Sequence, residues 1–274
     1  MGGSSRTGTQ SIDRVVNILR ELATRGTLGF RLLDLAGQCD IDRTTTHRIL
    51  KALVRQRLAE QRVTDRRYTV GPLLFELATS MTPFTRFQEL CRSSVEKVSR
   101  RQRAVATISL RSENDFVCIA RAGPNLRAMT VEVGTRRPLL TSVGGVAVLI
   151  ALPPAEMRTI ITENIGRLAR FDEKRHGAWR QMLQRSQRSG YAISDGLVVS
   201  GITAVGVPIF DPDHRPVASL ALVGHCEDFP HARINDVTQE LRSEASTIER
   251  GVQKLDEERA HRHSDHHNWK FIDD

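Results

Sequence analysis

The sequence has few cysteines and no long apolar run, and each of these features excludes a class of protein. Its four cysteines, Cys39, Cys91, Cys118 and Cys226, are far apart and form no C-x-x-C pair. This spacing excludes a disulfide scaffold and a zinc module, and it favours a reducing compartment. The longest apolar run, VGGVAVLIALPPA, is too short to span a bilayer, and MGGSSRTGTQ at the start lacks the core of a signal peptide. We expect a cytoplasmic protein with no membrane partner.

Motifs of the common enzyme classes are also missing. There is no G-x-S-x-G elbow, P-loop, G-x-G-x-x-G or H-E-x-x-H. Ser142, Asp195 and His225 could form a triad only if three distant segments met, so a hydrolase-like enzyme is an alternative that few residues support. The run from His225 to Glu227 is predicted as a strand, where neighbouring side chains point to opposite faces. We expect no catalytic residue, no metal site and no cofactor.

Positive charge is concentrated in one short segment. The chain carries a formal charge of +8, and residues 42–67 hold eight Lys/Arg against three Asp/Glu, an excess of five. Residues 1–85 as a whole have the same excess, so this segment accounts for all of it. A solvated helix face usually mixes in acidic residues that form i,i+4 pairs. The cluster therefore favours a surface that binds phosphate.

The first 70 residues have the pattern of three helices and a hairpin. An apolar stripe from Ile12 to Leu22, with Ser11 as its cap, predicts the first helix, and LLDLA predicts the second. In DRTTTHRILKAL, Asp42 (or Asp40) can cap a third helix that buries Ile49, Leu50 and Leu53. LAEQRVTDRRYTVG predicts two short strands with a turn near Thr64. This order is that of a winged helix-turn-helix, whose third helix enters the major groove.

Three consecutive threonines are poor helix formers, but they suit the first turn of a recognition helix. Short hydroxyl side chains let the backbone come close to DNA and can bond phosphates or base edges. Cations on the same helix would bind phosphate or guanine, and the hairpin would add further contacts. We predict that Arg43, Thr44, Thr45, Arg48 and Lys51 of the helix and Arg62, Arg66 and Arg67 of the hairpin bind double-stranded operator DNA.

The rest of the chain predicts an α+β domain. GPLLFELATSMT is a helical connector, and alternating segments at 104–112, 116–123, 128–134, 190–196, 202–211 and 216–225 predict antiparallel strands. Helices are expected at 87–102, 142–152, 176–190 and 233–255. Helices beside one antiparallel sheet suggest a sensor domain with room for a small ligand.

In this order and spacing, several stretches resemble the IclR family of bacterial transcriptional regulators. They include SIDRVVNIL, TTTHRILKALVRQRLAE, RYTVGPLLFEL, VEVGTRRPLLTSVGGVAVLIAL, RSGYAISDG and GITAVGVPIFDPDHRPVASLALVG. The resemblance implies a winged helix, a linker helix that helps dimerisation, and a GAF-like effector-binding domain. It also implies a homodimer or dimer of dimers that senses small organic acids from catabolic pathways. Repressors and activators both occur.

The resemblance also implies an effector pocket at the loop before the 142–152 helix, whose amide groups suit a carboxylate. The implied pocket residues are Leu126, Arg137, Ser142, Val143, Gly144, Ser194, Asp195, Ile202, Ala204, Leu220 and Leu222. Arg136 is an alternative to Arg137 as the inward cation. The family usually has consecutive acidic residues after GYA, where this chain has residues 194–197, SDGL. Where the family often has an Arg-Cys pair and a Gly-Lys pair, this chain has Thr203–Ala204 and Gly145–Val146. These departures make one wall less polar, which favours a larger, aromatic acid.

We therefore expect a sequence-specific regulator of a catabolic operon, controlled by an organic acid. The expected parts are a flexible start (1–9), a winged helix-turn-helix domain (10–71), a linker helix (72–85), a GAF-like domain (86–257) and a disordered His-rich tail (258–274). A ligand-binding module without a DNA role is the other alternative, but it leaves the basic segment unexplained.

Overall fold

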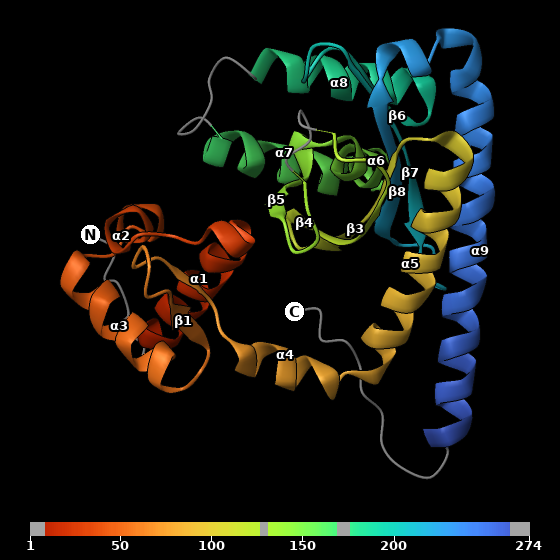
Figure 1. Ribbon diagram of the computed structural model, residues 1–274. Coiled ribbons are helices and arrows are strands. Elements are labelled where there is room, and N and C mark those ends of the chain that lie inside the picture. Colours follow the sequence, from red (N-terminus) through yellow and green to blue (C-terminus); the bar gives the residue numbers. More distant parts are fainter. Residues whose placement is uncertain (1–8, 127–130, 169–175, 264–274) are drawn as a thin grey trace. The chain divides into compact units, whose positions relative to one another are not determined.

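The computed structural model describes residues 9–126, 131–168 and 176–263, and the chain folds into two compact units (Figure 1). Residues 1–82 form the first unit, and residues 83–133 and 137–274 make up the second. Each unit has its own buried apolar core. Among the described residues, no helix is both long enough and apolar enough to cross a membrane.

Three helices build the first unit because apolar side chains recur at helical spacing. They are α1 (Gln10–Thr24), α2 (Leu32–Cys39) and α3 (Arg43–Arg55), with a 3-10 turn η1 (Gly26–Leu28) after α1. All three contribute to one core, whose fully buried side chains include Ile18, Leu22, Leu35 and Leu50. The expectation that Ser11 caps α1 is wrong, because the helix begins at Gln10 and Thr9 occupies the cap position.

A hairpin and a short helix complete the first unit. Strands β1 (Ala59–Gln61) and β2 (Tyr68–Val70) pair antiparallel, and Tyr68 also bridges to Phe30. Helix α4 (Pro72–Thr79) follows, and none of its residues is buried within the chain. A glycine precedes α4 because a Cβ at Gly71 would lie 2.3 Å from the backbone oxygen of Arg57. The unit is the winged helix-turn-helix that the sequence predicts.

A six-stranded sheet with the order β5-β4-β3-β8-β7-β6 forms the centre of the second unit. Its strands are β3 (Val105–Ser112), β4 (Asp115–Ala122), β5 (Arg136–Pro138), β6 (Ala192–Asp195), β7 (Ile202–Phe210) and β8 (Pro216–His225). Strand β3 pairs antiparallel with β4 and β8, and β7 does so with β8 and β6. In β4, Ile119 is left out of the register with β3, which makes a β-bulge beside Ser109.

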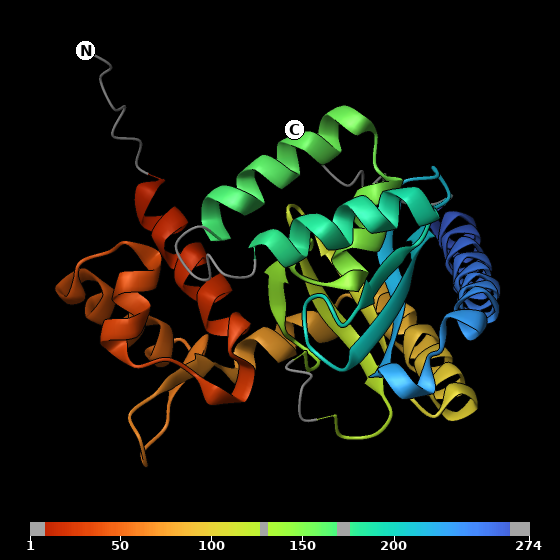
Figure 2. The same cartoon turned by 90° about the horizontal axis from the view of Figure 1, so that it is seen from above.

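Helices cover both faces of this sheet (Figure 2). Helices α5 (Thr82–Gln102) and α9 (His231–His263) lie on one face, where Val95 and Leu241 pack against β7 and β8. Helices α6 (Val143–Ala151), α7 (Pro154–Leu168) and α8 (His176–Ser189) lie on the other face together with the 3-10 turn η2 (Leu139–Thr141). A further 3-10 turn, η4 (Cys226–Asp228), follows β8. The α+β class predicted from the sequence is confirmed.

Three details differ from the expectations. The predicted strand 128–134 falls partly on 127–130, outside the described residues, while 131–134 are irregular and β5 comes later. Helix α7 was not expected, because its polar and β-branched residues give a weak periodic pattern. Helix α9 continues to His263, so residues 258–263 of the expected tail are helical, and the remainder lies outside the described residues.

Two adjacent glycines let α6 pack closely on its surroundings. A Cβ at Gly145 would lie 2.0 Å from the carbonyl oxygen of Leu139. A Cβ at Gly144 would lie 2.9 Å from Ser219 Oγ and 3.2 Å from Ser109 Oγ. All three distances are shorter than ordinary van der Waals contact, so α6 or its neighbours would have to shift to accept a larger residue.

Gly145→Ala tests this close approach. Because backbone atoms block the new methyl group, we expect the free energy of unfolding to fall by about 1–3 kcal/mol. Gly166→Ala in α7 is the matched control, since nothing lies within 4 Å of a Cβ there. That variant is expected to gain up to about 1 kcal/mol from helix propensity. Urea unfolding of the full chain, followed by circular dichroism, measures both, and a Gly145→Ala protein of wild-type stability would contradict the packing.

Candidate functional site

The start of α3 is fixed by its own side chains. Asp42 Oδ1 accepts a hydrogen bond from the backbone N–H of Thr45 at 2.8 Å. This bond lowers the pKa of the Asp42 carboxyl below its usual value of 3.8, and the positive charge of Arg14 adds to the effect. Thr46 is fully buried, and its hydroxyl donates to the Asp42 carbonyl oxygen at 2.9 Å. Of the three threonines, Thr46 therefore stabilises the start of the helix and is not exposed at the surface.

The other face of α3 carries exposed cations that form no ion pair within the described chain. Arg43, Arg48 and Lys51 are exposed, and none has an ion pair or a side-chain hydrogen bond to another described residue. Thr44 is exposed on the first turn, and Thr45 is half-buried beside it. A helix with three uncompensated cations and a hydroxyl on one face has the composition that phosphate and base edges require.

Two of the three hairpin arginines predicted to bind DNA form hydrogen bonds within the first unit. Arg62 donates to the Leu28 carbonyl oxygen at 2.8 Å and to Asp65 Oδ2 at 2.9 Å. Arg67 donates to the Gly29 carbonyl oxygen at 3.1 Å, and its backbone N–H bonds Asp65 Oδ1. Both arginines thus tie the hairpin to the turn after α1. Arg66 is exposed at the tip of the hairpin and adopts a left-handed backbone conformation with φ of 58°.

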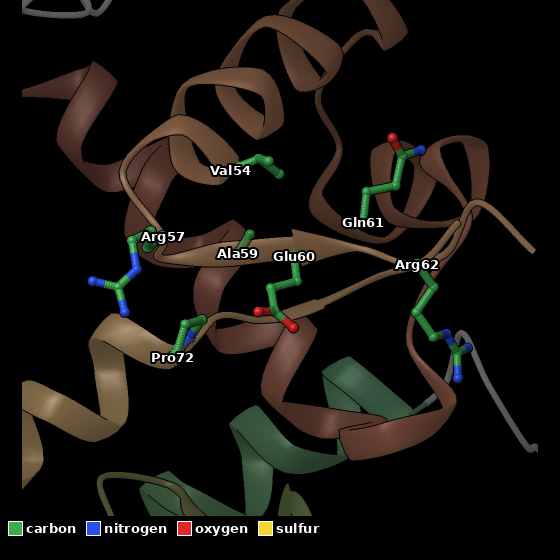
Figure 3. Close-up of a pocket in the computed structure, with 7 residues that line it drawn as sticks. All are labelled: Val54, Arg57, Ala59, Glu60, Gln61, Arg62 and Pro72. Carbon is green, nitrogen blue, oxygen red and sulfur yellow. The ribbon is translucent and has the colours of Figure 1, made fainter. Parts of the chain in front are cut away.

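A shallow groove of about 320 Å³ lies between the end of α3, β1 and the start of α4 (Figure 3). Arg57 beside it is paired with Glu76, and Arg62 is bonded as described above. Glu60 extends its carboxylate over the groove between these two arginines (Figure 3). This acidic group would repel an organic acid, so the groove is a poor candidate for the effector site.

In the second unit, the structure brings part of the predicted effector set together at the start of α6. Ser142 caps α6, with its Oγ accepting from the Gly145 N–H at 3.0 Å. Val143 and Ala204 belong to the same buried cluster. Ser194 pairs with Ala204 across β6 and β7, on the face that α6 covers. Leu126 and Ile202 form a smaller cluster with Val105.

Four predicted residues lie elsewhere. Leu220 and Leu222 point to the opposite face of the sheet, into the core formed with α5 and α9. Asp195 alternates with Ser194 and so faces away from α6; its oxygens contact Thr203 Oγ1 at 3.0 Å and Arg185 at 3.5 Å. Arg137 is half-buried on the edge strand β5, next to Arg136. In the structure these four residues do not join the others at the start of α6, and Asp195 is separated from a triad with Ser142.

The residues that β8 and β3 present to α6 are instead Ser219, Ala221 and Val223, and Val105, Thr107 and Ser109. On β4 the same face carries Cys118 and Arg121. None of these was predicted as an effector residue. The signal was present in the sequence, because the two-residue period of PVASLALVGH defines two faces, but it does not say which face meets α6.

Neither metal binding nor thiol chemistry is supported in the part of the chain that the structure describes. Within that part, no group of three His, Cys, Asp or Glu side chains is placed to hold a metal ion. Burial raises the pKa of the Cys39, Cys91 and Cys118 thiols to about 12. Neutral thiols are weak ligands and weak nucleophiles.

Comparisons with known proteins agree with this arrangement. Residues 11–63 match the model of the IclR helix-turn-helix domain, and residues 85–250 match that of the bacterial transcriptional regulator IclR C-terminal domain. The HTH-type transcriptional regulator BhcR of Paracoccus denitrificans (strain Pd 1222) is 24% identical over 250 residues, covering 89% of this chain and 86% of the relative.

Solved structures share the fold. An IclR family transcriptional regulator from Brucella abortus superposes with a TM-score of 0.70 at 18% identity, covering 89% of this chain and 93% of that one. An IclR homologue from Microbacterium hydrocarbonoxydans, complexed with 4-hydroxybenzoate, gives 0.65 at 21% identity, covering 89% and 100%.

A helix-turn-helix unit with an open cationic helix, followed by a separate ligand-binding domain, defines a DNA-binding transcriptional regulator. The chain belongs to the IclR family of these regulators, since the C-terminal model alone matches more than half of it. The protein is therefore a regulator and not an enzyme.

The Asp42 cap predicts a specific dependence on pH. Because the pKa of Asp42 is lowered in the folded state, its charge stabilises the fold above the unfolded-state pKa and loses this effect as the pH falls through the folded-state pKa. Asp42→Asn keeps a capping oxygen but removes the charge. We expect a difference in Tm between wild type and variant that is full above about pH 5 and closes below 3.8. A difference that does not change with pH would show that the charge plays no part.

Proposed function

We propose that the protein binds the operator of a catabolic operon through α3 and the hairpin. The observation that carries this proposal is the set of exposed α3 cations without partners in the described chain. In the proposed complex, Arg43, Thr44, Thr45, Arg48 and Lys51 contact the major groove, and Arg66 contacts the backbone from the hairpin tip. Arg62 and Arg67 act mainly by holding the hairpin in position.

A small organic acid is proposed to control this binding from the second unit. The family assignment supports a ligand-binding domain, and the Microbacterium homologue was solved with 4-hydroxybenzoate. The face under α6 carries the apolar Val105, Leu126 and Ile202, which suit an aromatic or similarly apolar body. Ser142, Val143, Gly144, Ser194 and Ala204 border the same face.

We further propose that the protein acts in the cytoplasm as a homodimer or a dimer of dimers. Two winged helices would then bind two half-sites, about one helical turn of DNA or a multiple apart. Helix α4 supports this assembly, because Phe75 is 75% exposed and Leu77 is 55% exposed within the chain. Apolar side chains exposed to this extent favour burial against a second copy.

Binding to the upstream intergenic DNA of its own operon tests the proposal. Fluorescence anisotropy at several salt concentrations, with excess nonspecific competitor, is expected to give tight binding that weakens steeply with salt. The panel of added acids should include benzoate and 4-hydroxybenzoate, one of which is expected to change the operator affinity. Failure to select any sequence from a random DNA library would refute the DNA-binding role of α3.

Arg48→Ala separates base contacts from phosphate contacts. If Arg48 contacts a base, its loss should cost roughly 1–3 kcal/mol of operator binding and relax specificity at one position. Lys51→Ala should weaken all sequences about equally and reduce the salt dependence. Arg158→Ala, an exposed arginine of α7, is the control that should change neither. If Arg48→Ala weakens binding to operator DNA and to random DNA by the same free energy, Arg48 contacts phosphate and not a base.

A further inference from the structure

Arg121 is a largely buried arginine on the sheet face that α6 covers. Arg121 on β4 pairs with Thr107 on β3, which in turn pairs with Ala221 on β8. The next row along the same face is Cys118, Ser109 and Ser219. Because a Cβ at Gly144 would lie within 3.2 Å of both serine hydroxyls, this face is the one that meets the start of α6.

The Arg121 guanidinium is buried without enough partners. Its side chain is 14% exposed, and its Nε and Nη2 atoms are buried with no hydrogen-bond acceptor in the structure as described. Glu132 Oε2 lies 3.7 Å from Nε, too far for a hydrogen bond, and the Glu132 side chain is 64% exposed. The other titratable neighbour, Cys118, has a pKa of about 12 and carries no charge. A buried cation with unsatisfied donors costs free energy unless a ligand supplies the acceptors.

The surroundings of Arg121 define which kind of ligand could supply these hydrogen-bond acceptors. One row further along the face, Val105 pairs with Val223, and Leu126 and Ile202 pack against them. The arginine therefore has hydroxyl-bearing strand positions on one side and an apolar cluster on the other. A ligand that fits both would have one anionic group and an apolar body.

We propose that Arg121 binds the carboxylate of the effector, a monocarboxylic acid with an apolar body that lies toward Leu126 and Ile202. This inference rests on the proposed control of the regulator by an organic acid. A guanidinium presents two parallel N–H donors to a carboxylate, and both gain strength where water is excluded. One arginine balances one negative charge, which favours a monocarboxylate over a doubly charged phosphate.

Arg121→Met in the full-length protein tests the assignment. Methionine has a similar length but no donors, so loss of the charge–carboxylate contact should weaken acid binding roughly 30-fold or more. The probes are acetate, benzoate, phenylacetate, 4-hydroxybenzoate and inorganic phosphate, measured by isothermal titration calorimetry. Because two buried donors without acceptors are removed and only a 3.7 Å ion pair with the exposed Glu132 is lost, the ligand-free variant should melt at or above the wild-type Tm.

Arg111→Met on β3 is the matched control. Arg111 lies on the same sheet and pairs with Glu156 of α7 at 2.5 Å, so its loss should lower Tm and leave acid binding unchanged. Arg121→Lys keeps the charge and should retain part of the affinity that Arg121→Met loses. Operator binding of each variant, measured on the same preparation, separates failure of this inference from failure of the proposed function.

The inference holds if wild type binds a carboxylate of the panel and Arg121→Met loses that binding without a fall in ligand-free Tm. It is overturned if Arg121→Met binds the acid as wild type does, while operator binding shows that the regulator is intact. It is also overturned if only inorganic phosphate binds, or if no carboxylate binds and Arg121→Met melts as low as Arg111→Met.

Discussion

The two faces of the central sheet are buried against different helices, and this constraint governs the whole second unit. Each strand must send alternate side chains into two separate cores. On β8, Leu220 and Leu222 enter the core of α5 and α9, whereas Ala221 and Ser219 lie under α6. Large aliphatic side chains thus fill one side, and small or polar ones occupy the other. The small residues allow α6 to approach the sheet closely, as the contacts of Gly144 show.

In the first unit, acidic residues are used internally and the cations of α3 are left outside. Asp42 caps α3, and Asp65 orders the hairpin by accepting from Arg62 and from the Arg67 backbone. These carboxylates satisfy local donors and do not neutralise the outer face of α3. The positive potential of the segment is therefore a consequence of how its few acids are placed, as much as of the number of its cations.

Local patterns predicted most of the elements, because apolar periodicity and capping act over one or two turns. The three helices of the first unit, the hairpin and the long strands β7 and β8 follow from such patterns. The face assignment of β8 did not, since it depends on which helix packs from above, a contact between distant segments. Likewise, Arg62 and Arg67 look like surface cations until the turn after α1 supplies carbonyl oxygens at Leu28 and Gly29.

The β-bulge at Ile119 has a consequence for the evolution of this domain. Cys118 and Arg121 are three positions apart, so a regular strand would place them on opposite faces, yet both face α6 because one residue is left out of register. Because the bulge absorbs the extra residue, deleting Ile119 would leave only one residue between Cys118 and the arginine, and both would still face α6 in a regular strand. The arginine would turn into the aliphatic core beneath α5 and α9 only if the bulge straightened while the extra residue was kept. One codon can therefore be inserted or lost at this point of β4 without moving the cation from the face of α6.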